Sequence, residues 1–275
     1  MSRRLSKDIT IEKLMEEGLL KKGSDESFII RRIPFGLPDL DEIVSGGIPR
    51  DRITILTGTY SAGKSFLVQL LIKQGLGKGL KAAYIDTERS FDPIWWKQVG
   101  INVDDLLVSQ PPTGESTINV VIALAESGYD IIAIDSLAGM IPSEIAEKDA
   151  EQKFIVSQAK VINRLMQKLL STKHHAAIVC TNQLRGHIGP GPIDVMPGGW
   201  GQLFYGHLLL RVFREGWIEE KGERVGFDMK IVCRKSKVGR GYRECVLPFR
   251  FRGEIDRLAM LMDRAIEAGL IEQSG

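Results

Sequence analysis

The chain has 275 residues, of which 43% are hydrophobic and 26% charged, and its formal net charge is +2. This length and composition fit one large or two small globular domains, and they exclude disordered and collagen-like chains. A net charge so close to zero gives no argument about DNA as a partner. No run approaches the roughly 18 apolar residues of a membrane span, and the start lacks the apolar run of a secretion signal. We therefore expect a cytoplasmic protein without a membrane partner.

The first 35 residues differ in pattern from the rest of the chain. The spacing of apolar residues predicts a short amphipathic helix over residues 11–20 and an extended segment over 27–33. We interpret residues 1–35 as an arm appended to a core.

After the arm, apolar β-rich runs alternate with segments of helical length. The runs are residues 53–56, 82–85, 106–109, 131–134 and 177–181. Uniformly apolar strands that alternate with helices are typical of a buried parallel sheet covered by helices on its faces. The sequence therefore predicts an α/β fold with a mainly parallel central sheet.

The sharpest motif follows the first of these strands and opens the next helix. It has the spacing G-x-x-x-x-G-K-S, in which glycines let backbone amides turn around phosphates, a lysine reaches the outer phosphates and a serine binds Mg²⁺. This predicts a phosphate loop with ATP and Mg²⁺ as ligands. The expected ATP-binding residues here are Gly58, Thr59, Tyr60, Ser61, Ala62, Gly63, Lys64, Ser65 and Phe66.

Polar residues follow three of the other strands, where ligands of open α/β sheets bind. Glu88 is a candidate for the base that activates the attacking water, or it is a solvated turn glutamate. Asp135 would hold the metal together with Ser65, or it merely caps a turn. Gln183 would sense the outer phosphate, or it is a satisfied loop amide.

The C-terminal part changes character. Closely spaced β-like runs at residues 207–213, 227–233 and 244–249 predict antiparallel strands. Residues 254–272 show helical spacing of Ile255, Leu258, Leu261 and Ile266 on one face, which predicts a helix that packs on the core.

The order of these motifs resembles the RecA recombinase family across residues 35–271. The stretches that carry the resemblance are YIDTERSFDP (84–93), SQPPTGE (109–115), IDSLAGMIP (134–142), NQLR (182–185) and the glycine pair 198–199. The resemblance implies a RecA-like P-loop NTPase core. It also implies that Glu88 is the catalytic glutamate, that Gln183 is the nucleotide-sensing amide, and that Asp92 and Trp95 contact adenine.

The resemblance further implies that the Gly- and Pro-rich segment 184–199 is a mobile DNA-binding loop. Bare glycine amides and an arginine suit phosphates, so binding to single-stranded DNA should be independent of sequence and should weaken as salt rises. Taken alone, such a segment is typical of any surface loop. The expected DNA-binding residues are Arg185, Ile188, Gly198, Gly199 and Trp200.

Lys235 and Lys237 match the lysines by which RecA-like subunits reach into a neighbour's ATP site, and they join Lys64, Glu88 and Gln183 as expected catalytic residues. Without the resemblance they indicate only a solvated basic strand end. Sites completed by the next subunit imply a head-to-tail homo-oligomer, either a helical filament or a ring. The arm would then dock on the neighbouring subunit.

We expect three parts: an assembly arm (1–35), an ATPase core (36–252) and a C-terminal helix on the core (253–275). Because the sequence stops at residue 275, the family's usual C-terminal DNA-gathering domain is expected to be absent. The implied function is a DNA-dependent ATPase that forms a filament on single-stranded DNA and pairs it with a homologous duplex. The alternatives are a regulatory paralogue without strand exchange and a motor resembling the hexameric helicases.

Overall fold

The computed structural model describes residues 10–145, 151–184 and 196–272. It divides the chain into two compact units, residues 1–31 and residues 32–275, which are described separately. The break lies slightly before the end of the expected arm at residue 35. Within the described ranges, no helix has the length and apolar character needed to cross a bilayer.

The smaller unit holds less regular structure than the sequence pattern suggests. Helix α1 (Ile11–Glu16) is shorter than the expected helix over residues 11–20, and it buries none of its side chains. It ends because Gly18 takes a left-handed φ of 69°, the conformation that commonly stops a helix. The expected extended segment over residues 27–33 is wrong in part, because it begins with a turn of 3₁₀ helix, η1 (Glu26–Phe28).

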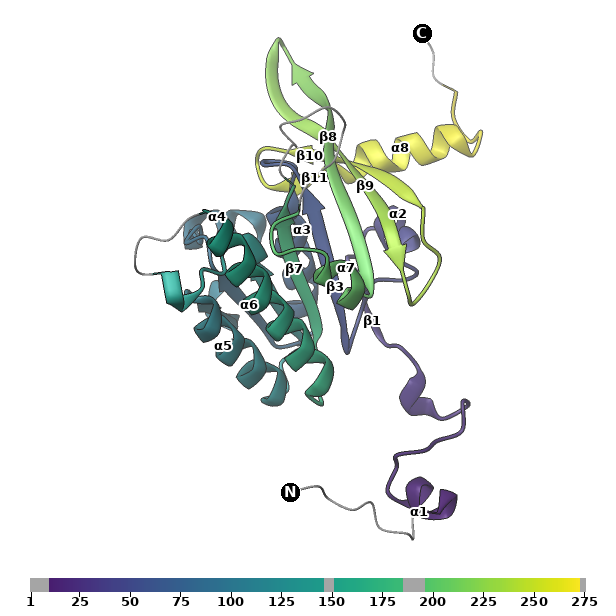
Figure 1. Cartoon of the computed structure of the whole chain (residues 1–275). Helices are drawn as coiled ribbons and strands as arrows, with labels where there is room; N and C mark the ends of the chain where they lie inside the picture. Colours follow the sequence, from purple (N-terminus) through teal and green to yellow (C-terminus); the bar gives the residue numbers. More distant parts are fainter. Residues whose placement is uncertain (1–9, 146–150, 185–195, 273–275) are drawn as a thin grey trace. The chain divides into compact units, whose positions relative to one another are not determined.

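A nine-stranded sheet forms the centre of the larger unit (Figure 1). In spatial order its strands are β11 (Glu254–Ile255), β10 (Glu244–Arg250), β9 (Glu223–Ser236), β8 (Leu208–Glu220), β3 (Arg52–Gly58), β7 (Ala177–Gln183), β6 (Ile131–Asp135), β4 (Ala82–Asp86) and β5 (Leu106–Ser109). The neighbours from β8 to β5 pair in parallel, whereas β8 to β11 are joined by antiparallel pairing. A separate antiparallel pair joins β1 (Arg32–Ile33) to β2 (Ile48–Pro49). The predicted fold class is confirmed.

Helices cover both faces of the sheet, including its antiparallel strands. They are α2 (Pro38–Ile43), α3 (Lys64–Leu76), α4 (Pro93–Val99), α5 (Gly114–Glu126), α6 (Glu151–Ser171), α7 (Gly201–Tyr205) and α8 (Arg257–Glu267), with 3₁₀ turns η2 (Val103–Asp105), η3 (Leu137–Gly139) and η4 (Ser143–Ile145). Strand β6 shows why both faces are apolar. Ile131 and Ala133 enter one hydrophobic core with α3, whereas Ile132 and Ile134 enter a second core with α5 and α6.

Strand β8 joins the two kinds of pairing. The predicted antiparallel strands are confirmed, because β9 pairs antiparallel with both β8 and β10. On its other edge β8 pairs in parallel with β3, with Thr54 opposite Leu208, which the sequence pattern does not predict. The chain can run this way because α7 lies between β7 and β8, so the two strands are not joined by a tight hairpin. Antiparallel pairing starts only at β9, after a turn in which Lys221 and Gly222 both have positive φ, as hairpin turns require.

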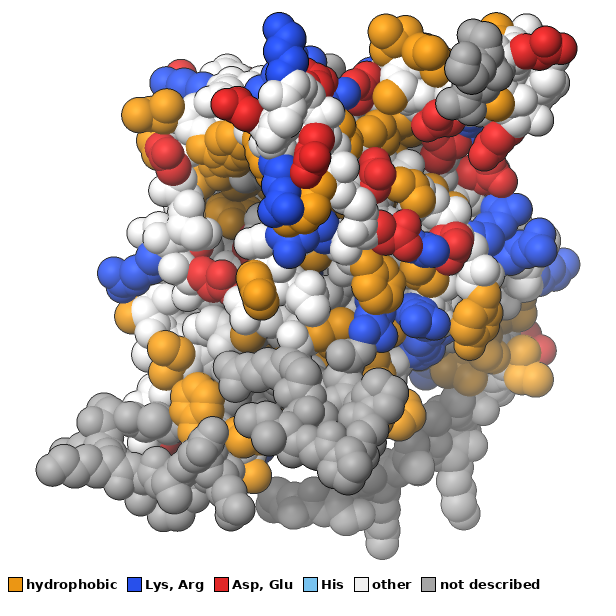
Figure 2. Space-filling view, turned by 90° about the horizontal axis from the view of Figure 1, so that it is seen from above, with side chains coloured by type: hydrophobic (Ala, Val, Ile, Leu, Met, Phe, Trp, Pro, Cys, Tyr) orange, Lys and Arg blue, Asp and Glu red, His pale blue; other side chains and the backbone are white. Residues whose placement is uncertain are grey.

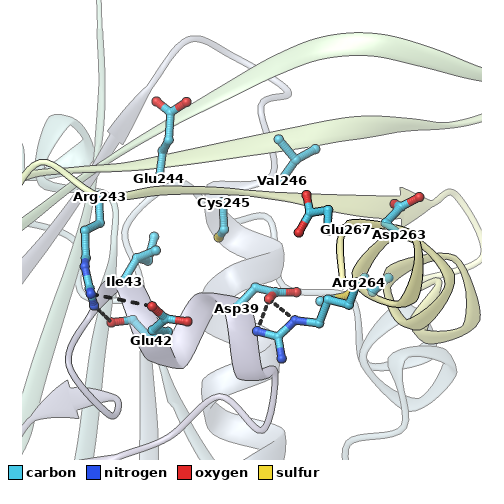
Figure 3. A pocket seen from close by; sticks show the side chains of 11 residues that line it. Asp39, Glu42, Ile43, Arg243, Glu244, Cys245, Val246, Asp263, Arg264 and Glu267 are labelled. Carbon is cyan, nitrogen blue, oxygen red and sulfur yellow. Dashed lines mark hydrogen bonds and ion pairs between the residues drawn. The ribbon is translucent and has the colours of Figure 1, made fainter. Parts of the chain in front are cut away.

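Helix α8 corrects the expectation that Leu258 and Leu261 pack on the core. Both side chains are exposed, and Met260 is the residue that α8 buries. Its other anchor is polar, because Arg264 forms an ion pair with Asp39 of α2 across a cavity of about 440 Å³ (Figure 3). Met260 and this ion pair therefore help to hold α8 on the core, whereas Leu258 and Leu261 of its apolar stripe face solvent.

Candidate nucleotide site at the carboxyl edge of the sheet

The phosphate-loop motif lies where the sequence predicts it, between β3 and α3. Ser61 and Gly63 take positive φ values of 52° and 97°, which turn the backbone sharply before the helix begins. The first amides of α3 have no partner within the helix and carry its partial positive charge. This geometry suits an anion such as a phosphate group.

The neighbouring strand packs so closely against Gly58 that no side chain fits at this position. A Cβ atom at this position would lie 2.3 Å from the carbonyl oxygen of Val212 in β8. We expect Gly58→Ala to lower the free energy of unfolding by about 1–3 kcal/mol, because a backbone oxygen cannot move aside cheaply. Urea unfolding measures this change. Gly23→Ala, which meets nothing within 4 Å, is the control, and equal midpoints for the two variants would contradict the close approach of β8.

Lys64 folds back over the loop. Its Nζ donates hydrogen bonds to the carbonyl oxygens of Gly58 at 3.1 Å and Thr59 at 2.7 Å. Burial lowers the pKa of Lys64, while the charges of Asp135 and Glu88 oppose that shift. The loop therefore presents a desolvated cation within electrostatic reach of two carboxylates.

Asp135 is buried at the end of β6, and both of its oxygens are held. The Tyr84 hydroxyl donates to one oxygen at 2.9 Å, and the Thr181 hydroxyl donates to the other. Burial raises the pKa of Tyr84, and the neighbouring Asp135 carboxylate adds to this rise. This phenol therefore stays protonated and keeps donating to the carboxylate.

The donors available for a metal fit Mg²⁺. Ser65 is exposed in the first turn of α3, and Asp135 supplies a fixed carboxylate at the same edge of the sheet. In the described part of the chain, no group of three or more His, Cys, Asp or Glu side chains could form a cage for a metal. Mg²⁺ commonly binds through one or two protein oxygens and takes its other ligands from water and phosphates.

Glu88 is not a free turn residue. Its Oε1 accepts hydrogen bonds from the Ser136 hydroxyl and, at 3.2 Å, from Nε2 of Gln183. The hydroxyl of Thr87 donates to the Ser136 carbonyl at 2.6 Å and ties the two strand ends together. The structure thus brings Glu88 and Gln183 together, with Ser136 as a partner that the sequence pattern did not single out.

The turn that carries Glu88 is anchored by the buried carboxylate of Asp86. It accepts hydrogen bonds from the backbone N–H groups of Ser90 at 3.1 Å and Phe91 at 2.9 Å, and from Nε2 of Gln110 at 2.8 Å. A carboxylate with several donors fixes a turn firmly, so the position of Glu88 is set by the fold.

A cavity of about 350 Å³ adjoins the phosphate loop. Its lining residues are Ser61, Ala62, Gly63, Lys64, Ser65, Phe66, Gln69, Trp95, Phe227, Phe249 and Phe251. The Trp95 indole N–H donates to Oε1 of Gln69 at 3.3 Å. Asp92, the other residue expected at adenine, is exposed, caps α4 by accepting from the Ile94 N–H at 2.9 Å, and is not among the lining residues.

The sequence pattern did not predict the aromatic wall of this cavity, which consists of Phe227, Phe249 and Phe251. The antiparallel strands provide three of its rings: Phe227 lies in β9, Phe249 lies in β10, and Phe251 directly follows β10. Phe66 packs on Phe249 with ring centroids 4.5 Å apart. Phe66 itself is only 5% exposed, so its side chain is mainly a core residue. Planar aromatic surfaces beside a phosphate loop suit a nucleotide base.

Lys235 and Lys237 contact the short helix α7. Lys235 donates to the carbonyl oxygens of Leu203 and, at 2.9 Å, of Gly206, and Lys237 donates to that of Phe204 at 2.7 Å. Burial lowers the pKa of Lys235, and the charge of Lys237 adds to this effect. Both lysines therefore bind carbonyl oxygens at the C-terminal end of α7.

The expected DNA-binding residues are only partly described, because Arg185 and Ile188 lie outside the described residues. Gly198 and Gly199 have φ values of 88° and 71°, a conformation that favours glycine. Trp200 is 73% exposed immediately before α7. Glycine amides and an exposed indole thus lie next to each other in this segment.

Together these features define an α/β nucleotide-binding protein, with a phosphate loop after a central strand and polar side chains at the ends of its parallel neighbours. A family model described as the RecA N-terminal domain matches residues 5–256. Protein RecA of Thermus aquaticus is 34% identical over 274 residues, which cover 97% of this chain and 81% of the relative. Protein RecA of Rhodospirillum rubrum is 32% identical over 273 residues, or 96% and 75% of the two chains. The chain belongs to the RecA family, and the predicted resemblance is confirmed.

Proposed function

We propose that this chain is an ATP-dependent DNA recombinase that assembles as a filament on single-stranded DNA and pairs it with a homologous duplex. Hydrolysis of ATP then releases the DNA. The observation that carries the proposal is the gathering of Lys64, Asp135, Glu88 and Gln183 at one edge of the sheet in a chain of the RecA family.

In this proposal each residue has a defined task. The loop amides and Lys64 bind the phosphates of ATP, and Ser65 and Asp135 hold the Mg²⁺ that neutralises their charge. Glu88 orients the attacking water and accepts its proton. Gln183, which contacts Glu88 in the structure, reports whether the outer phosphate is in place.

DNA binding is proposed to rest on the segment around Gly198, Gly199 and Trp200, not on the charge of a whole face. Figure 2 shows basic and acidic side chains interspersed among the described residues of the face seen from above, so this part of the face has no patch of a single charge. Gly199 is exposed and glycine amides can bind phosphates, and the exposed Trp200 indole can stack on a base.

A strand-exchange assay tests the proposed function directly. Purified protein, ATP and Mg²⁺ are incubated with circular single-stranded DNA and a homologous linear duplex. We expect joint molecules, together with helical filaments in negative-stain images. ATP turnover stimulated by single strands, but without joint molecules or filaments, would instead favour a regulatory paralogue or a ring motor.

We expect the double substitution Lys235→Ala/Lys237→Ala to lower ATP turnover of the assembled protein by at least about 100-fold, because positive charge offered to a transferring phosphate is worth several kcal/mol. In this proposal the lysines leave α7 and reach the ATP site of the next copy. Turnover at protein concentrations above and below assembly measures the effect.

Two further experiments distinguish action of the lysines on a neighbouring copy from a role within their own subunit. Lys230→Ala removes a lysine from the same strand that pairs with Glu215 and Glu244, and it should leave turnover unchanged. Mixing the double variant with Lys64→Ala should restore turnover, since each protein supplies what the other lacks. A mixture as inactive as its parts would contradict action between copies.

A further inference from the structure

Two side-chain amides form a buried pair where β7 meets the start of α7. Asn182 and Gln202 both have no exposed surface. Nδ2 of Asn182 donates to Oε1 of Gln202 at 2.7 Å and to the Pro197 carbonyl at 2.9 Å. Nε2 of Gln202 donates to the carbonyl oxygens of Pro197 at 2.6 Å and Gly199 at 3.2 Å. The pair therefore binds the backbone directly before α7.

This network is complete, which makes it rigid. Each amide nitrogen has two N–H groups, and all four are used, while Oδ1 of Asn182 accepts the Gln183 N–H at 2.9 Å. A Cβ atom at Gly198 would lie 3.2 Å from Nε2 of Gln202 and 2.4 Å from Cδ1 of Ile162. The backbone thus wraps closely around Gln202, and a buried network with every group satisfied favours one arrangement.

The same stretch of β7 also holds the candidate catalytic groups. Because side chains alternate along a strand, Thr181 and Gln183 point to one face and Asn182 to the other. Thr181 donates to Asp135, and Gln183 donates to Glu88 at 3.2 Å. Any displacement of Asn182 by Gln202 therefore moves the two residues that contact the metal-binding carboxylate and the base.

We propose that Gln202 is a positioning residue: through Asn182 it couples the segment at Gly199 and Trp200 to the position of Gln183 and Glu88. Order imposed on that segment by single-stranded DNA is thereby transmitted to the base. This inference rests on the proposed function, since it concerns how ATP turnover responds to DNA.

The test compares Gln202→Met, which keeps the size of the side chain and removes its amide, with the matched control Gln167→Met. Gln167 also contacts the α7 region, donating to the Tyr205 hydroxyl at 3.0 Å, but it is exposed on α6 and does not reach β7. We expect Gln202→Met to lower the stimulation of kcat by single-stranded DNA about tenfold, the size of a coupling energy between linked sites. DNA-independent turnover and KM for ATP should stay within about twofold, and Gln167→Met should match the parent.

Every outcome bears on the inference. If the parent shows no DNA stimulation, the proposed function fails and the inference fails with it. If the parent is stimulated and Gln202→Met is stimulated equally, only the inference is overturned. Equal losses of DNA-independent and DNA-stimulated turnover would show a merely structural role and also overturn it.

A second series covers the case in which Gln202→Met does not fold. Gln202→Asn keeps the amide but is one methylene too short to span the network, and it should lose stimulation in the same way. Adding Asn182→Ala to either variant should cause little further loss of stimulation, because residues of one network are not additive. Full additivity would contradict transmission through Asn182.

Discussion

Replacing Lys64 by alanine is expected to weaken ATP binding by about 3 kcal/mol, or about 100-fold in Kd, since charge-assisted hydrogen bonds contribute about 1.5–3 kcal/mol each. The Lys64 ammonium is held at the mouth of the loop by the carbonyl oxygens of Gly58 and Thr59. Phosphate oxygens would be stronger partners for this desolvated cation than backbone carbonyls. Titration with a fluorescent ATP analogue measures the change, and nucleotide-dependent assembly should be lost together with affinity.

We expect Lys64→Ala to remain folded, so the loss of affinity should not result from unfolding. Burial lowers the pKa of Lys64, which means that the fold bears a cost for keeping it charged. Alanine is also a good helix former at the start of α3. Lys73→Ala is the matched control, because Lys73 lies on the same helix and donates to the Val99 carbonyl at 2.7 Å. Unchanged affinity in Lys64→Ala would show that the loop does not bind the triphosphate.

Glu88→Gln is expected to lower ATP turnover by at least about 100-fold, because positioned general bases contribute about 10²- to 10⁴-fold. The amide cannot accept the proton of the attacking water. Its oxygen can still accept the hydrogen bonds from Ser136 and Gln183, so the geometry of the site should persist. Single-turnover hydrolysis, measured at saturating ATP, separates this chemical step from binding.

The same variant should still bind ATP and single-stranded DNA, and it should remain assembled because hydrolysis no longer releases it. The control is Glu126→Gln, which removes an exposed carboxylate at the end of α5. Persistent turnover in Glu88→Gln would identify another group as the base. Loss of ATP binding in this variant would show that Glu88 has a structural role.

The parallel strands and the phosphate loop could be predicted because their signals are local. Strand β6 is apolar on both faces, and a strand buried on both faces requires helices on both sides of its sheet. The loop glycines and Lys64 have a fixed spacing that only one backbone geometry uses. Asp135 and Glu88 follow from the same logic, because the carboxyl ends of parallel strands meet at one edge of the sheet.

The parts that could not be predicted depend on contacts between distant segments. Parallel pairing of β8 with β3 joins residues about 150 positions apart, as Thr54 and Leu208 show, and strand patterns carry no partner information. The aromatic wall of Phe227, Phe249 and Phe251 has the alternation of an ordinary strand. Its place beside the phosphate loop follows only from the spatial order of the sheet.

Polar residues that position the site are the hardest to predict from the sequence. Ser136 and Gln202 stand singly in the sequence, and one serine or glutamine is typical of any surface. Only their burial shows that they must have partners inside the fold. Helix α8 gives the opposite error, because its apolar stripe predicts packing while Leu258 and Leu261 face solvent.

The most direct measurement of the central claim, an ATP site that responds to DNA, is steady-state ATP turnover by the unaltered chain with and without single-stranded DNA. We predict that turnover rises with single strands of any sequence and that the stimulation fades as salt is increased. The same turnover at saturating DNA as without it, or no ATP hydrolysis in either case, would contradict the account.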